Sequence, residues 1–488
     1  MSRIKFTAVT STAMLSLALG GCAAVGGPIP DASAPITQSE AQMGSEAHPQ
    51  LLAEFGGAMS GTQAQYVEQV GKNIAVQSGL GNARESFTVS LLNSPVNNAF
   101  AIPGGYIYTT RQLVSLMNNE AELAGVLGHE VGHVAARHSQ RRQAKAQQNS
   151  LLGLLGAVVG SVVGGGFGQQ LGQLAMQGSQ LLTLKFSRTQ ELEADDLGIR
   201  YLNQAGYDPR AMGTVLQSLA MQNALDARIQ GRDNASIPEW ASTHPDPASR
   251  VQSALAKAQG MTGVTNRDTF LSRIDGLLYG DDPQQGVIEG RQFIHPELRL
   301  AFTAPQGFYM INGTRAVSIS GQSGKAQLTL APYNGNLNAY VTSVFAGLSK
   351  EQQITPQAIQ RTTVNGLPAA YSTARVTSGS DQIDVTVFAY EFANDRAYHF
   401  LAITPAGQAS AFNPMFSSMR RIDAQQAGSI VPRVLDVVTV GSGDTVASLA
   451  RRMAYTDNQV ERFRVLNGLG ANEGVSAGQK VKVVIRGR

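Results

Sequence analysis

The sequence predicts an α+β protein with a mainly helical first half and a small sheet, a strand-rich middle part, and a short separate segment at the C-terminus. Three observations support this prediction. Apolar residues from Glu120 to His138 repeat with the helical period and form a wide face. Strand-like alternation becomes frequent only after residue 265. A linker-like stretch at residues 425–433 sets the last 50 or so residues apart.

The composition suits a protein of several domains. The chain has 488 residues, of which 43% are hydrophobic and 15% charged, which is long for a single core. Lys and Arg number 38 against 35 Asp and Glu, and no basic block stands out, so we expect no nucleic-acid partner. Cys22 is the single cysteine, which excludes a disulfide within the chain.

The N-terminus has the pattern of an export signal. Arg3 and Lys5 precede a mostly apolar run over residues 6–19, which is too short for a permanent membrane span. The following Leu-Gly-Gly-Cys at 19–22 resembles a bacterial lipobox, which implies a lipid on Cys22. The alternative is an ordinary secretory signal that is cleaved elsewhere.

Cleavage before Cys22 would define a signal peptide at residues 1–21 and a lipoprotein tether at 22–38. The tether is rich in small residues and proline, so we expect it to be flexible. Ala23 follows the cysteine, which by the same resemblance favours the outer membrane. The sequence thus predicts a periplasmic protein that is held at the membrane through lipid.

The helical stretch contains His129-Glu130-Val131-Gly132-His133, an H-E-x-x-H pattern. Positions i and i+4 of a helix lie on one face, so His129 and His133 can direct both imidazoles at one metal ion. Zinc held in this way activates water, and Glu130 is placed to act as the general base of peptide hydrolysis. The alternative is a core helix with two hydrogen-bonded histidines.

A second pair of polar residues follows at helical spacing. Glu191 and Asp195 are also i and i+4, so one can bind the metal while the other supports a ligating imidazole. Two histidines and one carboxylate leave one zinc position open for water, as in catalytic sites. We therefore expect one zinc ion per chain.

Four motifs in order resemble the BepA/HtpX-type zinc metallopeptidases, the family that includes the CAAX prenyl protease. The resemblance covers about residues 36–255 and implies a zincin-type peptidase domain at 39–260. It further implies that Glu191 is the third ligand and that Asp195 supports the site. The motifs are NAFAIPGGYI at 98–107, HEVGH at 129–133, SRTQELEAD at 187–195 and STHPDP at 242–247.

The last motif contains His244 in a proline-rich loop, where a lone histidine is ordinarily a surface or hydrogen-bonded residue. The resemblance implies that His244 can approach the zinc and block or assist the site. Arg250 is a candidate for supporting contacts or for oxyanion stabilisation. We expect His138, five residues beyond His133, on another face of the helix in a structural role, and Glu193 in a surface or helix role.

Two further segments bear on a substrate cleft. Residues 98–109 read as a strand at which a substrate can pair by β-augmentation, or as a plain sheet strand. Residues 146–184 carry no charge, and 151–166 are apolar and rich in glycine, which disfavours a helix. We expect a loop over the cleft, with contact to a membrane surface as the alternative.

The rest of the chain divides into two parts. Residues 265–424 predict an α+β domain, vaguely similar to PsbP or Mog-type folds, with no motif that carries chemistry, so its role stays unknown. Residues 425–433 read as a linker. Residues 434–488 resemble LysM, a βααβ module that binds glycans containing N-acetylglucosamine, which implies peptidoglycan as a partner; a contact to protein alone is the alternative.

These features together predict a zinc endopeptidase of the bacterial cell envelope. Its expected substrates are unfolded, misfolded or misassembled envelope proteins, because a cleft beside an edge strand suits extended chains. The alternative from a different class is a chaperone-like or peptidoglycan-tethering assembly lipoprotein whose zinc site is latched and largely inactive.

Overall fold

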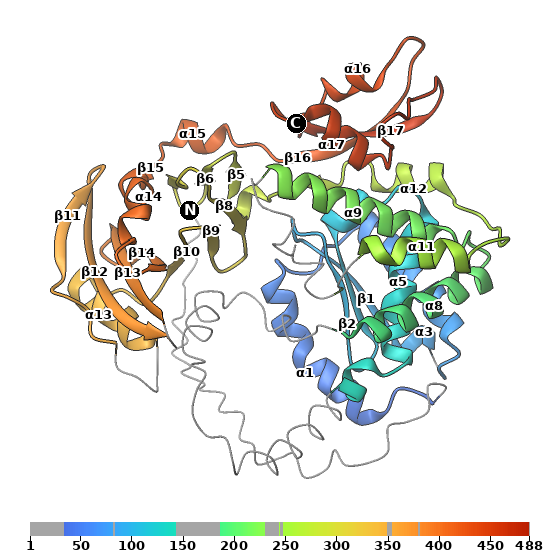
Figure 1. Ribbon diagram of the computed structural model, residues 1–488, viewed down its shortest axis with the longest axis horizontal. Coiled ribbons are helices and arrows are strands. Elements are labelled where there is room, and N and C mark those ends of the chain that lie inside the picture. The colour runs from blue at the N-terminus through green and yellow to red at the C-terminus, as the bar shows by residue number, and fades with distance from the viewer. Residues whose placement is uncertain are drawn as a thin grey trace, which may run out of the picture.

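The computed structural model describes residues 34–81, 83–142, 186–229, 244, 247–348, 354–378 and 381–487 (Figure 1). The predicted lipidation site Cys22, the glycine-rich segment at 151–166 and most of the STHPDP motif lie outside the described residues. Within the described ranges, no helix is both long and apolar enough to cross a membrane.

A small three-stranded sheet lies at the centre of the first half. β1 pairs in parallel with β3, and β3 pairs antiparallel with β2, so the order among the described residues is β1-β3-β2, with β2 as an edge strand. The turn between β2 and β3 contains Gly104 and Gly105, both with positive φ, a conformation that glycine adopts readily. The strands are β1 (Thr88–Leu92), β2 (Ala99–Ile102) and β3 (Tyr106–Thr110).

Helices surround this sheet in the first half of the chain (Figure 1). The mainly helical first half that the sequence predicts is therefore present. The helices are α1 (Gln38–Glu54), α2 (Thr62–Ala75), η1 (Val76–Ser78), α3 (Ala83–Ser86), α4 (Arg111–Leu116), α5 (Glu120–Ala135), α8 (Arg188–Gln204), α9 (Ala211–Ile229), α11 (Pro247–Lys257) and α12 (Arg267–Ile274).

The tether predicted at residues 22–38 ends earlier than expected. The carbonyl groups of Ala34 and Pro35 accept hydrogen bonds from the buried Arg137 guanidinium, at 2.8 and 3.1 Å. Thr37 then caps α1 in a capping box with Glu40. The last few residues of the predicted tether are therefore part of the folded domain.

α5 is a buried helix with a well-formed start and an abrupt end. The Asn119 side chain accepts a hydrogen bond from the Glu122 amide, and Glu120 and Glu122 place negative charge in the first turn. The helix ends at Ala135, and Arg137 has a left-handed φ of 52°. The chain therefore changes direction directly after the H-E-x-x-H pattern.

α5 and α8 approach each other closely because glycines line their contact. A Cβ added at Gly132 would lie 3.2 Å from the Ala194 carbonyl oxygen, and one at Gly198 would lie 3.2 Å from the His129 amide nitrogen. Larger side chains at these positions would push the helices apart. This contact sets the distance between the metal-binding candidates on the two helices.

The middle of the chain forms two antiparallel sheets with separate cores on the faces of the larger one. The seven-stranded sheet has the order β11-β12-β13-β14-β10-β9-β8, with α13 (Leu337–Gly347) on one face, and the four-stranded sheet has the order β15-β7-β6-β5. The strands are β5 (Val287–Glu289), β6 (Gln292–His295), β7 (Leu300–Thr303), β8 (Tyr309–Asn312), β9 (Val317–Gly321), β10 (Gly324–Leu330), β11 (Gln360–Val364), β12 (Leu367–Ser378), β13 (Asp381–Ala393), β14 (Arg396–Pro405) and β15 (Arg420–Arg421).

Proline and glycine separate β7 from the next strand. β7 ends at Thr303, because Pro305 cannot donate to a ladder and Gly307 has a φ of 80°. β8 starts only at Tyr309. The remaining short helices are η4 (Pro283–Gln285), η5 (Ala409–Phe412) and α14 (Asn413–Ser418).

The C-terminal segment forms the expected βααβ unit, but it is not held by a free linker. α15 (Ala424–Gly428) occupies the segment expected as linker, and β16 begins at Arg433. β16 pairs with β17 on one side and with β4 (Leu278–Tyr279) on the other, so the unit joins a strand that follows α12. The unit consists of β16 (Arg433–Thr439), α16 (Val446–Ala450), α17 (Gln459–Leu466) and β17 (Lys480–Arg486).

The C-terminal unit also shares one hydrophobic core with the first half of the chain. Buried residues such as Phe463 and Val483 belong to the same cluster as Leu123 on α5 and Phe270 on α12. Figure 1 shows the unit packed over α9 and α12. The middle part is therefore an insertion between β4 and β16, whose two ends meet in one sheet.

Lys482 on β17 is a polar anchor in this interface. Its side chain is fully buried, and its ammonium group donates to the carbonyl oxygens of Ser115 and Met117, at 2.8 and 2.5 Å. These carbonyls lie at the C-terminal end of α4, where helix carbonyls have no intrahelical partner. Burial lowers the pKa of Lys482 well below its ordinary value, while the negative charge of Glu122 on α5 raises it.

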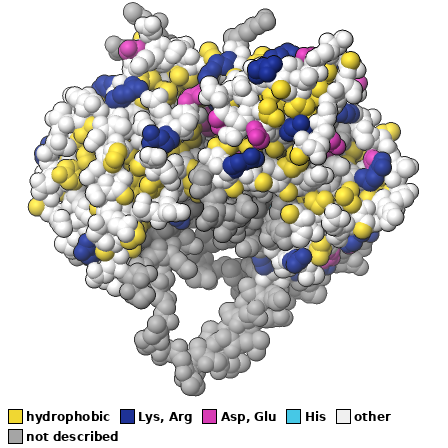
Figure 2. Space-filling model, turned by 45° about the horizontal axis from the view of Figure 1, so that its top comes forward, with side chains coloured by type: hydrophobic (Ala, Val, Ile, Leu, Met, Phe, Trp, Pro, Cys, Tyr) yellow, Lys and Arg dark blue, Asp and Glu magenta, His cyan; other side chains and the backbone are white. Residues whose placement is uncertain are grey.

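The surface gives no sign of a single charged docking patch on the face in Figure 2. Lys and Arg side chains lie scattered over it, with Asp and Glu side chains among them. This distribution agrees with the near balance of 38 basic and 35 acidic residues.

We expect Lys482→Met to lower the free energy of unfolding by about 3 kcal/mol, because buried carbonyl oxygens and the Glu122 carboxylate lose their cation. Chemical denaturation of the purified chain measures this. Lys480→Met, on the same strand but half-exposed, is the matched control and should change little. Equal stability of both variants would contradict an anchoring role for Lys482.

Candidate metal centre

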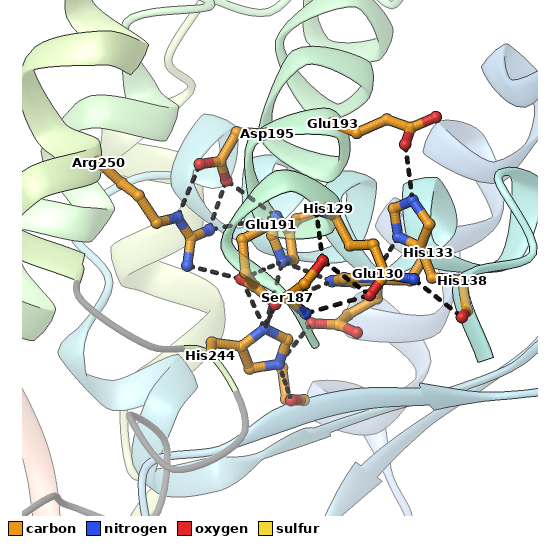
Figure 3. Close-up of polar contacts among 12 residues, drawn as sticks. His129, Glu130, His133, His138, Ser187, Glu191, Glu193, Asp195, His244 and Arg250 are labelled. Atoms are coloured by element: carbon orange, nitrogen blue, oxygen red, sulfur yellow. Dashed lines mark hydrogen bonds and ion pairs between the residues drawn. The ribbon is translucent and has the colours of Figure 1, made fainter. Parts of the chain in front are cut away.

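The two histidines of the H-E-x-x-H pattern point the same ring atom to one place. His129 and His133 lie one turn apart on α5, both are buried, and their Nε2 atoms are 3.0 Å apart (Figure 3). Glu130 between them is also buried. The helical spacing thus produces the convergence that it predicts.

A carboxylate from α8 and a loop histidine complete the cluster. The Glu191 carboxylate oxygens lie 3.5 Å from His129 Nε2 and 3.6 Å from His133 Nε2. His244 Nδ1 lies 3.1 Å from Glu191 and 3.3 Å from His129 Nε2. One ligand atom from each of these four residues lies within 4.8 Å of the others.

Asp195 and Arg250 form hydrogen bonds and ion pairs with these candidate ligands. Asp195, one turn after Glu191, lies 2.9 Å from His129 Nδ1, so His129 presents Nε2 to the centre. Arg250 on α11 donates to both carboxylate oxygens of Asp195, at 2.7 and 2.5 Å, and pairs with Glu191 at 2.8 Å. Of the two roles expected for Arg250, this position favours supporting contacts over oxyanion stabilisation.

Burial, hydrogen bonds and neighbouring charges together set the pKa values of these groups. Burial would lower the pKa of His129, but hydrogen bonds to Asp195 and Glu191 raise it to about 9. Burial would raise the pKa of Glu191, but His244 and His129 hold it far below the usual range. Burial lowers the pKa of His133, and the charge of His129 lowers it further. Burial would raise the pKa of Asp195, but hydrogen bonds to Arg250 and His129 lower it. Glu191 and Asp195 thus stay ionised and attract positive charge into the cluster.

These residues fit a zinc ion. Imidazole nitrogens and one carboxylate oxygen are the donors that Zn²⁺ prefers in catalytic sites. The Oε2 atom of Glu130 is buried and has no hydrogen-bond partner among the described residues, so it is available to a group held at the centre. The buried cluster of His129, His133, Glu191 and His244 suits one zinc ion per chain.

His244 also connects the cluster to the edge strand β2. Its Nε2 lies 3.2 Å from the carbonyl oxygen of Ala99 on β2 and 3.5 Å from a carboxylate oxygen of Glu130. A strand that paired with β2 at this point would compete with His244 for the Ala99 carbonyl.

Phe186 also packs on the cluster, and no pattern in the sequence indicates it. Its ring stacks on His133, with centroids 3.9 Å apart and planes inclined by 18°. Only evidence that residues 133 and 186 lie close together in space would have identified Phe186 as part of the cluster.

The expectation for His138 is wrong in its geometry. Because α5 ends at Ala135 and the chain turns at Arg137, His138 does not continue around the helix but returns to His133. The two Nδ1 atoms are 2.8 Å apart. Glu193, expected on the surface, is half-exposed but lies 3.1 Å from His138 Nε2.

Residues 62–258 match peptidase family M48. The chain carries a peptidase family M48 domain. Residues 438–484 match the LysM domain, which covers all but the ends of the C-terminal βααβ unit. The resemblance seen in the motifs is therefore confirmed in both of its parts, and the M48 domain is that of a zinc metallopeptidase.

Several curated proteins resemble the M48 domain of this chain. The chain is 34% identical over 227 residues to a beta-barrel assembly-enhancing protease of Yersinia pestis, which covers 45% of this chain and 44% of that protein. It is 33% identical over 216 residues to the protein of the same name from Escherichia coli K12, covering 43% and 42%. It is 35% identical over 176 residues to the mitochondrial metalloendopeptidase OMA1 of Arabidopsis thaliana, covering 36% and 32%.

The chain thus spans less than half the length of the curated relatives that it matches first. Among solved structures, the solution structure of cyanobacterial PsbP from Synechocystis sp. PCC 6803 covers 27% of this chain and 91% of its own, at 11% identity and a TM-score of 0.22. A score this low carries no argument about the middle domain.

Proposed function

We propose that this protein is a zinc-dependent endopeptidase. The observation behind the proposal is the buried centre in which His129, His133 and Glu191 converge beside the free carboxylate oxygen of Glu130. A bound zinc ion would supply Lewis-acid activation of water and of the peptide carbonyl. Glu130 would accept the proton of the attacking water at Oε2 and deliver it to the leaving amine.

The proposed substrates are unfolded, misfolded or misassembled proteins of the bacterial envelope. β2 is an edge strand among the described residues, and its Ala99 carbonyl lies within hydrogen-bond distance of His244 at the centre. An extended chain can pair with such an edge and pass its backbone across the site, which suits unfolded segments rather than folded domains. The names of the bacterial relatives support a role in the quality control of β-barrel assembly.

We expect Glu130→Gln to retain about one zinc per chain and to lose hydrolysis by at least about 10²-fold, because only the proton acceptor is removed. Digestion of a reduced, unfolded envelope protein by the purified chain measures this, together with zinc content. Glu191→Ala is the companion variant, and it should lose most of the metal as well as activity. Full hydrolysis by Glu130→Gln would refute the proposed base.

We further propose that His244 regulates the site as a latch rather than serving as an essential ligand. Its ring lies within reach of His129, Glu191 and Glu130 and of the β2 edge, so it occupies space that water and substrate need. Asp195 and Arg250 would serve as supports for the resident ligands.

His244→Ala should keep zinc and cleave unfolded substrate several-fold faster than the wild type, since the fourth position and the Ala99 carbonyl become free. Rates at saturating zinc, with the protein's own cleavage followed in parallel, measure this. An inactive His244→Ala variant that retains zinc would overturn the latch and assign the imidazole to the developing oxyanion instead.

The proposed location is the periplasm, with a lipid on Cys22 that anchors the chain, by its sequence pattern, to the outer membrane. The LysM match at residues 438–484 supports contact with peptidoglycan. We expect Cys22→Ser, if exported, to move from the membrane to the soluble periplasmic fraction. Unchanged partition between the fractions would refute the lipid anchor and direct attention to residues 151–166.

A second function is a chaperone-like or peptidoglycan-tethering assembly role with a latched site. The observation that favours it is the burial of His244 among all three expected ligands, which fills the centre. Complementation of a deletion strain by Glu130→Gln separates the two, because a scaffold keeps its function in this variant and a peptidase loses it.

A further inference from the structure

The two histidines of the proposed zinc site receive different support. A ligating imidazole is held in place by a partner on its other ring nitrogen, which fixes both the tautomer and the ring orientation. His129 has the buried carboxylate of Asp195, itself clamped by Arg250. No carboxylate lies at the Nδ1 atom of His133 among the described contacts; another imidazole does.

That imidazole belongs to His138, and it leads on to a carboxylate. His138 is completely buried, its Nδ1 lies 2.8 Å from His133 Nδ1, and its Nε2 lies 3.1 Å from Glu193 (Figure 3). Arg141 pairs with both oxygens of Glu193 at 3.1 Å. The series His133, His138, Glu193 thus runs from the centre to the surface.

Hydrogen-bond chemistry permits one arrangement of protons along this series. If His133 binds metal through Nε2, its Nδ1 carries hydrogen and donates to His138 Nδ1. His138 must then carry its own hydrogen on Nε2, where it donates to the Glu193 carboxylate. Each group has one donor or acceptor for each neighbour, so none is left unmatched.

The fold holds His138 in this position from two sides. Arg137 adopts its left-handed conformation while its guanidinium forms an ion pair with Glu40 of α1, at 3.3 Å. On the other side, Gln190 in the first turn of α8 donates to the His138 carbonyl oxygen at 3.0 Å. A non-glycine residue with positive φ is costly, and such strain is retained where the surroundings require it.

From this geometry we propose that His138 and Glu193 are positioning residues that hold His133 for zinc, as Asp195 holds His129. The proposal rests on the zinc site of the proposed function. It replaces the structural and surface roles that the sequence suggested for the two residues. Because Glu193 is 41% exposed and Asp195 is 3% exposed, the support of His133 should be the weaker of the two.

We expect His138→Leu to weaken zinc binding by about 10- to 100-fold, the usual range for loss of a partner behind a ligand. His138→Gln should restore affinity to within a few-fold of the wild type, because its amide offers an acceptor to His133 and a donor to Glu193. Glu193→Leu should give a smaller loss than His138→Leu. Competition with a chromophoric chelator measures zinc affinity, without reference to hydrolysis.

The visible spectrum of the cobalt-substituted protein is the second measurement, since it reports ligand geometry rather than stability. It should shift in His138→Leu and return in His138→Gln. Arg141→Gln is the matched control: it removes the exposed partner of Glu193 and leaves His138 in contact, so affinity and spectrum should stay near wild type.

Wild-type zinc affinity and an unchanged cobalt spectrum in His138→Leu would overturn the proposal. So would a Gln variant that is no better than the Leu variant while both melt like the wild type, because the role would then be packing. If the His138 variants do not fold, the half-exposed Glu193 decides: unchanged affinity in Glu193→Leu refutes the series. A wild type that binds zinc but cleaves nothing would refute the proposed function alone.

Discussion

The close contact between α5 and α8 is the constraint on which the metal centre depends. Gly132 and Gly198 have no side chain that would separate the two helices. The approach is needed because His129 and His133 come from one helix and Glu191 from the other. The same contact places Asp195 beside Nδ1 of His129, so one pair of helices positions both the imidazole and the carboxylate that contacts it. A larger residue at either of these glycines would disturb ligand and support at once.

Two further elements complete the centre and restrict access to it. α11 supplies Arg250, which neutralises two buried carboxylates that would otherwise repel each other. The loop before α11 supplies His244, which contacts the ligands and the carbonyl of the edge strand. The His244 side chain therefore contacts both the candidate metal ligands and the edge strand β2.

The C-terminal unit is part of the fold that supports this centre. Lys482 binds the carbonyls at the end of α4, directly before α5, and β16 pairs with β4 beside α12. The LysM domain is thus docked on the M48 domain through a shared core rather than suspended on a flexible linker. The middle domain is inserted between them, with its own cores. A glycan contact at the LysM domain would therefore hold the proteolytic centre at a defined orientation.

The sequence by itself determined the elements whose chemistry is local. The i, i+4 spacing predicted that His129 and His133 converge, and on the second helix Glu191 lies in the same buried cluster while Asp195 contacts His129. It could not place His138, because helical periodicity says nothing about a helix that ends at Ala135 and turns at Arg137. Only tertiary structure decided that turn, through Glu40 and the backbone before α1, more than 90 residues away. The tertiary structure likewise decided the contacts of Phe186 and Lys482. Such contacts depend on which surfaces pack together, and they produce no periodic pattern in the sequence.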